Sequence, residues 1–138
     1  MSNSTQYINK LRSSGLRPTR QRIKICEILF NSGETFHFTV KELAKMIENQ
    51  VNIKVSLATI YNTVHAFNDK GYLKEIAINS SQSYFDTNTS HHHHFYDLSE
   101  KKLIDLEDKE VNPIEIKKAI PGKKIKSVEV LVKIDNNN

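Results

Sequence analysis

Residues 56–86 read SLATIYNTVHAFNDKGYLKEIAINSSQSYFD, and the fold class follows from this segment. Its first part has apolar residues at helical spacing, begins at a serine suited to cap a helix and closes at Gly71. Its second part holds two alternating runs, 72–78 and 83–86, around the polar segment 79–82, which has the composition of a hairpin loop. A helix followed by such a hairpin is typical of a winged helix, a helix-turn-helix variant.

Three more helices are predicted before this segment. They are residues 5–13, residues 17–30 with Pro18 in the first turn, and a helix that begins at Thr39, where Thr39 and Glu42 form a capping box. The core face of the last one would be Leu43, Met46 and Ile47. Together with the hairpin, these helices predict an N-terminal winged-helix domain over residues 1–87.

The remainder, residues 88–138, reads as a smaller domain. Strands are expected at 93–98, 102–106 and 125–134, with a short helix at 114–119. So few residues can hardly bury a core alone, and we expect this part to dimerise. The predicted fold class is therefore α+β, with an N-terminal winged helix and a small C-terminal α/β dimerisation domain.

Composition excludes several classes of protein. The 138 residues are 38% hydrophobic, and no run reaches the ~18 to 20 consecutive apolar residues of a membrane-spanning helix. No apolar secretory signal follows the polar first residues. The single cysteine, Cys26, excludes an internal disulfide and a zinc site built from several thiolates. We expect a cytoplasmic protein without a membrane partner.

The net charge of +4 is unevenly distributed. Residues 1–75 carry eleven Lys/Arg against six acids, whereas residues 76–138 carry nine against ten. The first six cations lie between Lys10 and Lys24 with no acid among them. This asymmetry indicates a polyanion-binding front half, although a solvated basic face would have the same composition.

The helix that follows Ser56 is the candidate recognition helix. Its first part offers side chains that fit base edges in a major groove, namely Ser56, Ala58, Thr59, Tyr61 and Asn62. Arg17, Arg20 and Arg22 would contact phosphates or a narrow minor groove. Tyr61 could instead belong to the core. We expect it to face outward, because Leu57, Ile60, Val64 and Phe67 already form an inward stripe.

Four consecutive histidines, His91 to His94, form the second notable feature. Imidazole is the commonest transition-metal ligand in proteins and is also an axial ligand of haem iron. In an extended strand, His91 and His93 would point to one face and His92 and His94 to the other. The run could therefore serve two sites.

Several of these motifs together resemble the ferric uptake regulator family in order and spacing. They are GLRPTRQR at 15–22, SLATIYNT at 56–63, Gly71-Tyr72, Tyr84-Phe85-Asp86 and the histidine run. Residues 85–95, FDTNTSHHHHF, with no Cys-x-x-Cys after them and a short C-terminal half, are most similar to the iron response regulator branch.

The resemblance implies a homodimer with a regulatory metal site between its domains. The positions that match the family ligands are His37, Asp86, His93 and Asp105, a mixed set suited to Fe²⁺, Mn²⁺ or Zn²⁺. The last histidine of the family pattern falls on Phe95, so His91 or His94 would have to substitute. Resemblance to the branch also implies haem binding at His92, His93 and His94.

Two departures from the family pattern have consequences. Asn62 stands where the family usually has an arginine, which implies a different operator sequence. Cys26 is followed by Glu27 rather than by the proline of a haem motif, and it lies on an apolar helix face. We therefore expect Cys26 to be a core residue.

Three functions are consistent with these features. The first is a dimeric transcriptional regulator of iron and haem metabolism, in which haem or a divalent metal modulates operator binding and haem lowers it. The second is a plain repressor that responds to Fe²⁺, Mn²⁺ or Zn²⁺ without haem sensing. The third is a metal hydrolase, which ranks low because nothing in the basic half serves such chemistry. We expect no enzyme activity.

Overall fold

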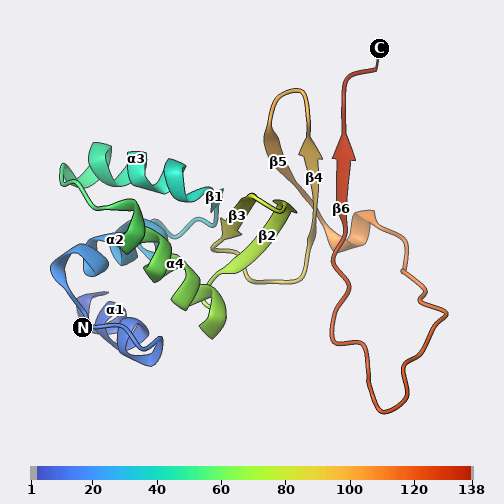
Figure 1. Ribbon diagram of the computed structural model, residues 1–138, viewed down its shortest axis with the longest axis horizontal. Coiled ribbons are helices and arrows are strands. Elements are labelled where there is room, and N and C mark those ends of the chain that lie inside the picture. The colour runs from blue at the N-terminus through green and yellow to red at the C-terminus, as the bar shows by residue number, and fades with distance from the viewer. Residues whose placement is uncertain (1–2, 138) are drawn as a thin grey trace. The chain divides into compact units, whose positions relative to one another are not determined.

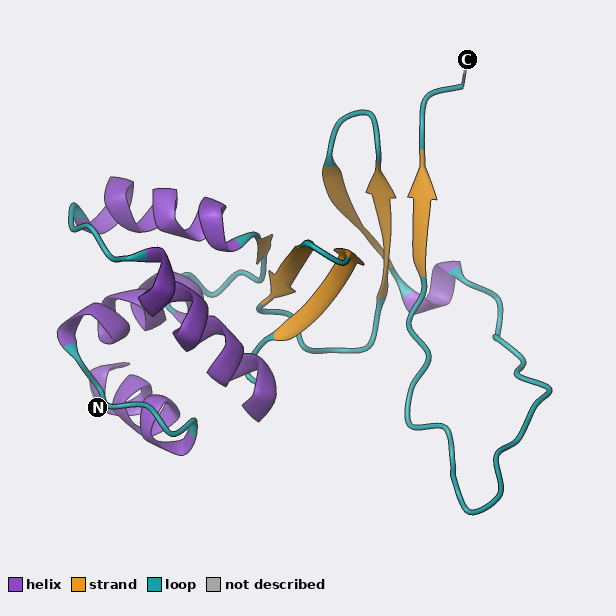
Figure 2. Cartoon of the chain, viewed as in Figure 1, coloured by secondary structure: helices purple, strands orange, loops and turns teal. Residues whose placement is uncertain are grey.

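The computed structural model describes residues 3–137 of the chain. The chain divides into two units between Thr89 and Ser90, two residues beyond the boundary expected at residue 87. The first unit contains all four α-helices and a small sheet, and the second contains another small sheet (Figures 1 and 2). The fold is α+β.

The helices of the first unit are α1 (Asn3–Ser13), α2 (Arg20–Phe30), α3 (Val40–Val51) and α4 (Leu57–Lys70). The capping box of α3 is present: the Glu42 N–H donates to Thr39 Oγ1 over 3.1 Å and the Thr39 N–H to Glu42 Oε1 over 2.8 Å. The prediction that Pro18 lies in the first turn of α2 was wrong. The N-cap is Thr19, whose hydroxyl oxygen accepts from the Arg22 N–H, so Pro18 precedes the helix.

Helix α4 has the boundaries that the sequence predicts. Ser56 Oγ accepts the Thr59 N–H over 3.2 Å, and Gly71 ends the helix at φ 90°, which favours glycine. Ile60, Val64 and Phe67 are fully buried, but the prediction that Leu57 faces the core was wrong, because this residue is 50% exposed. Periodicity gives the direction of a side chain and does not show whether a neighbour covers it.

The core of the first unit lies among these helices and includes Cys26, which is fully buried as predicted. The sheet at its edge has the order β1-β3-β2, with β1 (His37–Phe38), β2 (Lys74–Asn79) and β3 (Gln82–Asp86). β2 and β3 form the predicted hairpin. β1 was not predicted, since a strand of two residues has no readable alternation.

The sheet of the second unit has the order β5-β4-β6, with β4 (His93–Asp97), β5 (Lys102–Leu106) and β6 (Leu131–Ile134). β4 pairs antiparallel with β5 and parallel with β6. A 3₁₀ turn, η1 (Asp108–Glu110), follows β5.

Two predictions for the second unit were wrong. Residues 114–119 form no helix, and only the last four residues of the expected strand 125–134 are a strand. Residues 111–130 lack regular structure, and their isoleucines at 114, 116, 120 and 125 are exposed. These apolar side chains therefore alternate in the sequence without forming the buried face of a sheet. Among residues 3–137, no helix has the length and apolar character needed to cross a membrane.

Candidate DNA-binding surface and metal-binding clusters

The outer face of α4 carries the residues predicted to read bases. Tyr61 is 53% exposed, as predicted, and Asn62 and Ala58 are exposed beside it. The Tyr61 ring lies 4.1 Å from the ring of His65, which in turn contacts buried Phe85 edge-on at 5.4 Å. A ring that is already packed against a neighbour loses less conformational entropy when it contacts a partner.

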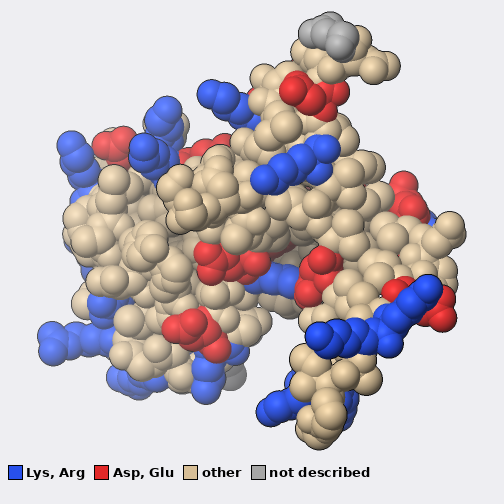
Figure 3. Space-filling view, turned by 45° about the vertical axis from the view of Figure 1, so that its right-hand side comes forward, with Lys and Arg blue, Asp and Glu red and all other residues tan. Residues whose placement is uncertain are grey.

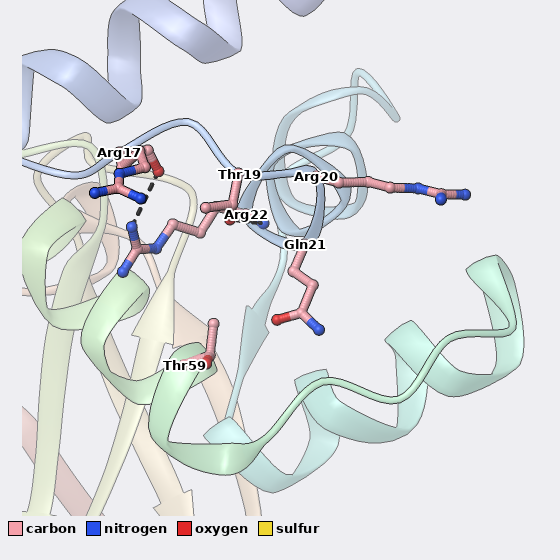
Figure 4. Close-up of a pocket in the computed structure, with 6 residues that line it drawn as sticks. All are labelled: Arg17, Thr19, Arg20, Gln21, Arg22 and Thr59. Carbon is pink, nitrogen blue, oxygen red and sulfur yellow. Dashed lines mark hydrogen bonds between the residues drawn. The ribbon is translucent and has the colours of Figure 1, made fainter.

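A surface pocket of about 640 Å³ joins α4 to the predicted phosphate-binding arginines. It is lined by Arg17, Thr19, Arg20, Gln21, Arg22 and Thr59 (Figure 4). Thr59 comes from α4, and the other five come from α2 and the segment before it. The pocket therefore places Thr59 of the candidate recognition helix beside a segment that carries three arginines, and guanidinium groups suit an anion with several oxygens.

The arginines of this pocket have different roles. Arg22 donates from Nη1 to the Arg17 carbonyl oxygen over 3.0 Å, and its Nε is buried without a hydrogen-bond partner among residues 3–137. Arg20 is exposed and extends away from the pocket in Figure 4. Arg22 is thus partly committed to holding the segment, whereas the Arg20 guanidinium is open to a partner.

Overall charge does not by itself mark a binding face. Lysine and arginine side chains are spread over the surface seen in Figure 3 and alternate there with acidic side chains. The candidate nucleic-acid surface is therefore defined by the pocket and the exposed side of α4.

The histidine run supplies two separate clusters in the second unit. On one face of β4, the Nε2 atoms of His92 and His94 lie 3.7 and 3.4 Å from Asp105 Oδ1. On the other face, the Nε2 atoms of His91 and His93 lie 3.4 and 3.0 Å from Asp108 Oδ1. In each cluster the candidate ligand atoms lie within 4.8 Å of one another. We call them the Asp105 cluster and the Asp108 cluster.

Hydrogen bonds to the other ring nitrogens distinguish the clusters. His92 Nδ1 lies 2.8 Å from the Ser90 carbonyl oxygen, which can only accept. Nδ1 therefore carries the proton, and in the neutral ring Nε2 presents a lone pair toward Asp105. A histidine that donates its second N–H to a backbone carbonyl is the usual arrangement of a metal ligand. The donors of the Asp105 cluster thus fit a divalent metal.

The Asp108 cluster has the opposite arrangement. His93 Nδ1 accepts the Val130 N–H over 2.9 Å, so Nε2 carries the proton and donates to Asp108. This hydrogen bond is the largest of the effects that lower the pKa of the Asp108 carboxyl. A metal here would have to displace the Nε2 proton of His93, so the cluster is already satisfied as a hydrogen-bonded pair.

The structure does not group the metal residues as the sequence analysis did. The register of β4 and β5 pairs His94 with Asp105 and His93 with Leu106, which puts His93 on the face opposite Asp105. His91 shares the face of His93. The expected set of His91, His93 and Asp105 is therefore divided, and the haem set of His92, His93 and His94 is divided for the same reason.

His37 and Asp86 belong to the first unit. They are direct partners in the β1–β3 register, and Asp86 is buried. Asp108 was not predicted, His92 was assigned to haem alone, and His94 was named for the metal only as one of two substitutes for the ligand lost at Phe95. The alternation of strand side chains, combined with the cross-strand register, would have identified His92 and His94.

Comparison with known proteins agrees with the family resemblance. The pattern described as "Ferric uptake regulator family" matches residues 13–133. The peroxide-responsive repressor PerR of Staphylococcus aureus is 35% identical over 110 residues, which are 80% of this chain and 72% of that protein.

Solved structures share the fold at lower identity. The ferric uptake regulator of Vibrio cholerae has a TM-score of 0.69 at 22% identity and covers 94% of this chain and 98% of its own. The ferric uptake regulator of Pseudomonas aeruginosa with manganese has a TM-score of 0.67 at 19% identity, covering 96% and 98%. At such identities these structures support the fold alone.

Proposed function

The chain belongs to the ferric uptake regulator family, and from this premise we propose that it is a homodimeric repressor whose operator binding responds to a divalent metal. The first unit acts as a winged helix that inserts α4 into the major groove. The observation that carries this proposal is that Thr59 of α4 lines one pocket with Arg17, Arg20 and Arg22.

The division of labour on DNA follows from the two sides of α4. The arginines bind phosphates, which fixes the position of the helix without reading sequence. Tyr61 and Asn62 are exposed and contact base edges, with Asn62 suited to the N6 and N7 atoms of adenine. Ser56 caps α4, so its hydroxyl is already used within the helix.

The metal is assigned to the Asp105 cluster. Two imidazoles and one carboxylate are a mixed donor set suited to Fe²⁺, Mn²⁺ or Zn²⁺. His37 and Asp86 remain the candidate ligands from the first unit. Bound metal changes DNA affinity only if it has different affinities for the DNA-binding and non-binding arrangements of the protein.

Haem is the second candidate ligand, because residues 85–95 resemble the iron response regulator branch. The alternation along β4 weighs against it. His93 faces away from His92 and His94, so the three histidines cannot all face one haem. We therefore favour the metal-responsive repressor without haem sensing.

Paired variants on the two faces of β4 test the metal assignment. His94→Ala removes a donor of the Asp105 cluster, and His91→Ala removes one of the Asp108 cluster from the same histidine run. Because His94 would be a direct ligand, we expect His94→Ala to weaken Mn²⁺ or Zn²⁺ binding by more than the roughly 10- to 100-fold that loss of an outer-shell partner costs, and to abolish metal-dependent operator binding. We expect His91→Ala to leave both near wild type. Calorimetry and fluorescence anisotropy with a selected duplex measure the two effects.

The opposite ranking of the two variants would contradict the assignment. Addition of haem to the same proteins separates the candidate ligands, because a shifted Soret band that His92→Ala weakens would favour haem. A parallel arm with hydrogen peroxide tests the response named for the Staphylococcus aureus relative. Failure of every duplex to bind the metal-loaded protein would refute the proposed function.

A further inference from the structure

A second, apolar groove of about 430 Å³ lies on α4 and is distinct from the arginine pocket. It is lined by Val40, Lys41, Leu57, Ala58, Tyr61 and Asn62, and its surface is almost entirely apolar. Leu57 and Tyr61 are 50% and 53% exposed, so two large apolar side chains of one helix turn face solvent together. Leaving this surface in water is unfavourable unless a partner covers it.

The position of the groove indicates what that partner is. Ala58 lines the apolar groove, whereas the next residue, Thr59, lines the arginine pocket. The first turn of α4 therefore borders the arginine pocket on one side and the apolar groove on the other, and Lys41 adds a cation to the apolar groove. None of the described residues that line the two pockets is acidic. This combination suits a polyanion that also presents apolar groups.

Duplex DNA has these properties in its major groove. Its phosphates are anionic, and the large apolar group on its base edges is the 5-methyl of thymine. The adenine paired with that thymine presents N6 and N7 to an amide such as that of Asn62, which lines the same groove. An A·T pair therefore matches both the apolar and the polar lining.

We propose that the groove of Val40, Leu57 and Tyr61 receives thymine 5-methyl groups and that Leu57 is a specificity-determining residue of the operator contact. The inference rests on the proposed function, because it requires α4 to enter the major groove. It explains why Leu57 is exposed at a position where helical periodicity would bury it. Asn62 then reads the same base pair or its neighbour.

Replacement of thymine by deoxyuridine tests the inference with minimal change. A duplex is first selected from a random library with the metal-loaded 138-residue protein, and each thymine is then replaced in turn. Deoxyuridine lacks only the 5-methyl group and keeps the base pair. For the wild type we expect one or two positions per half-site to lose about three- to fivefold in affinity, the size expected for one buried methyl group.

The variant Leu57→Ala should lose affinity for the thymine duplex and become insensitive to deoxyuridine at those positions. Leu98→Ala is the matched control, since Leu98 is 45% exposed and lines neither pocket. It should retain wild-type affinity and wild-type sensitivity. Because Leu57 is half exposed and alanine favours helices, the variant should fold, and its thermal melt by circular dichroism checks this.

Two results would overturn the inference while leaving the proposed function intact. One is a selected duplex whose affinity does not change with any deoxyuridine replacement. The other is a Leu57→Ala protein that still loses affinity at the same positions as the wild type. Absence of binding to any duplex is a separate outcome that refutes the proposed function itself.

Discussion

At the scale of single residues, two hydrogen bonds give neighbouring histidines different chemistry. His92 Nδ1 donates to the Ser90 carbonyl, whereas His93 Nδ1 accepts from the Val130 amide. In the neutral rings, Nε2 of His92 is therefore a base and Nε2 of His93 is a donor. The backbone thus leaves a lone pair on the face of the proposed metal site and satisfies the other face internally.

Cys26 gives a prediction on reactivity. Burial, as the largest effect, raises the pKa of its thiol to about 12. Because the thiolate is the reactive form, we expect the native protein to resist iodoacetamide at pH 8 and to be alkylated only after unfolding. Mass spectrometry of the labelled protein, with and without denaturant, measures this. Rapid labelling of the native protein would contradict it.

The same pKa shift has a consequence for stability. The folded pKa lies above the unfolded value, so the unfolded state loses its proton first as pH rises past about 9. The contribution of the Cys26 thiol to the free energy of unfolding is therefore complete below pH 9 and declines between pH 9 and about 12. Cys26→Ala removes this dependence and serves as the control in urea titrations at several pH values.

At the scale of elements, the capping box of α3 gives a prediction on stability. Thr39→Ala removes the acceptor of the Glu42 N–H and should lower the free energy of unfolding by about 1 kcal/mol. Thr89→Ala is the matched control, because Thr89 is exposed and lies outside the helices. Urea denaturation followed by circular dichroism compares the two. Equal effects would show that the cap is not a stabilising contact.

How well each element could be predicted depends on where its signal lies. α3 and α4 have their caps and apolar faces within a dozen or so residues, so their starts at Thr39 and Ser56 were predicted correctly. β1 exists because His37 and Phe38 pair with residues almost 50 positions away. Similarly, β6 is only four residues long because its length depends on pairing with β4. Such pairings leave no local pattern in the sequence.

The candidate sites show the same contrast. Exposure of Tyr61 was predicted correctly from the helical period, although the same period wrongly placed Leu57 in the core. The metal cluster depends on which residue of β5 lies opposite each histidine, and a shift of one position exchanges the two faces. Family matching placed His93 with Asp105, whereas the register places His94 there.

At the scale of the whole molecule, dimerisation remains a prediction. A 49-residue second unit (Ser90–Asn138) buries little apolar surface by itself, and its isoleucines at 114, 116, 120 and 125 are exposed. A dimer would present two copies of α4 and two arginine pockets to one operator. The dimer would then contact twice as many phosphates as one chain. The salt dependence of binding measures the number of phosphates contacted.

Arg20 is the residue to replace in order to count phosphate contacts, because its guanidinium is exposed and is not required to hold the Arg17 segment. Each phosphate contact contributes about 0.9 to the slope of log K against log salt concentration. If a dimer binds and Arg20 contacts one phosphate per chain, Arg20→Ala should reduce the slope by about 1.8. A monomer would give a reduction of about 0.9.

Arg12→Ala is the control for net charge, since Arg12 is an exposed arginine on α1 that lines neither pocket. It removes the same charge and should leave the slope unchanged. Anisotropy titrations of the selected duplex between 50 and 200 mM salt span the range in which such slopes are measured. If Arg12→Ala and Arg20→Ala reduced the slope equally, the two arginines would act through overall charge, and Arg20 would not contact a phosphate. A reduction near 1.8 for Arg20→Ala alone would require both the phosphate contact and the second subunit, because neither by itself produces a change of that size.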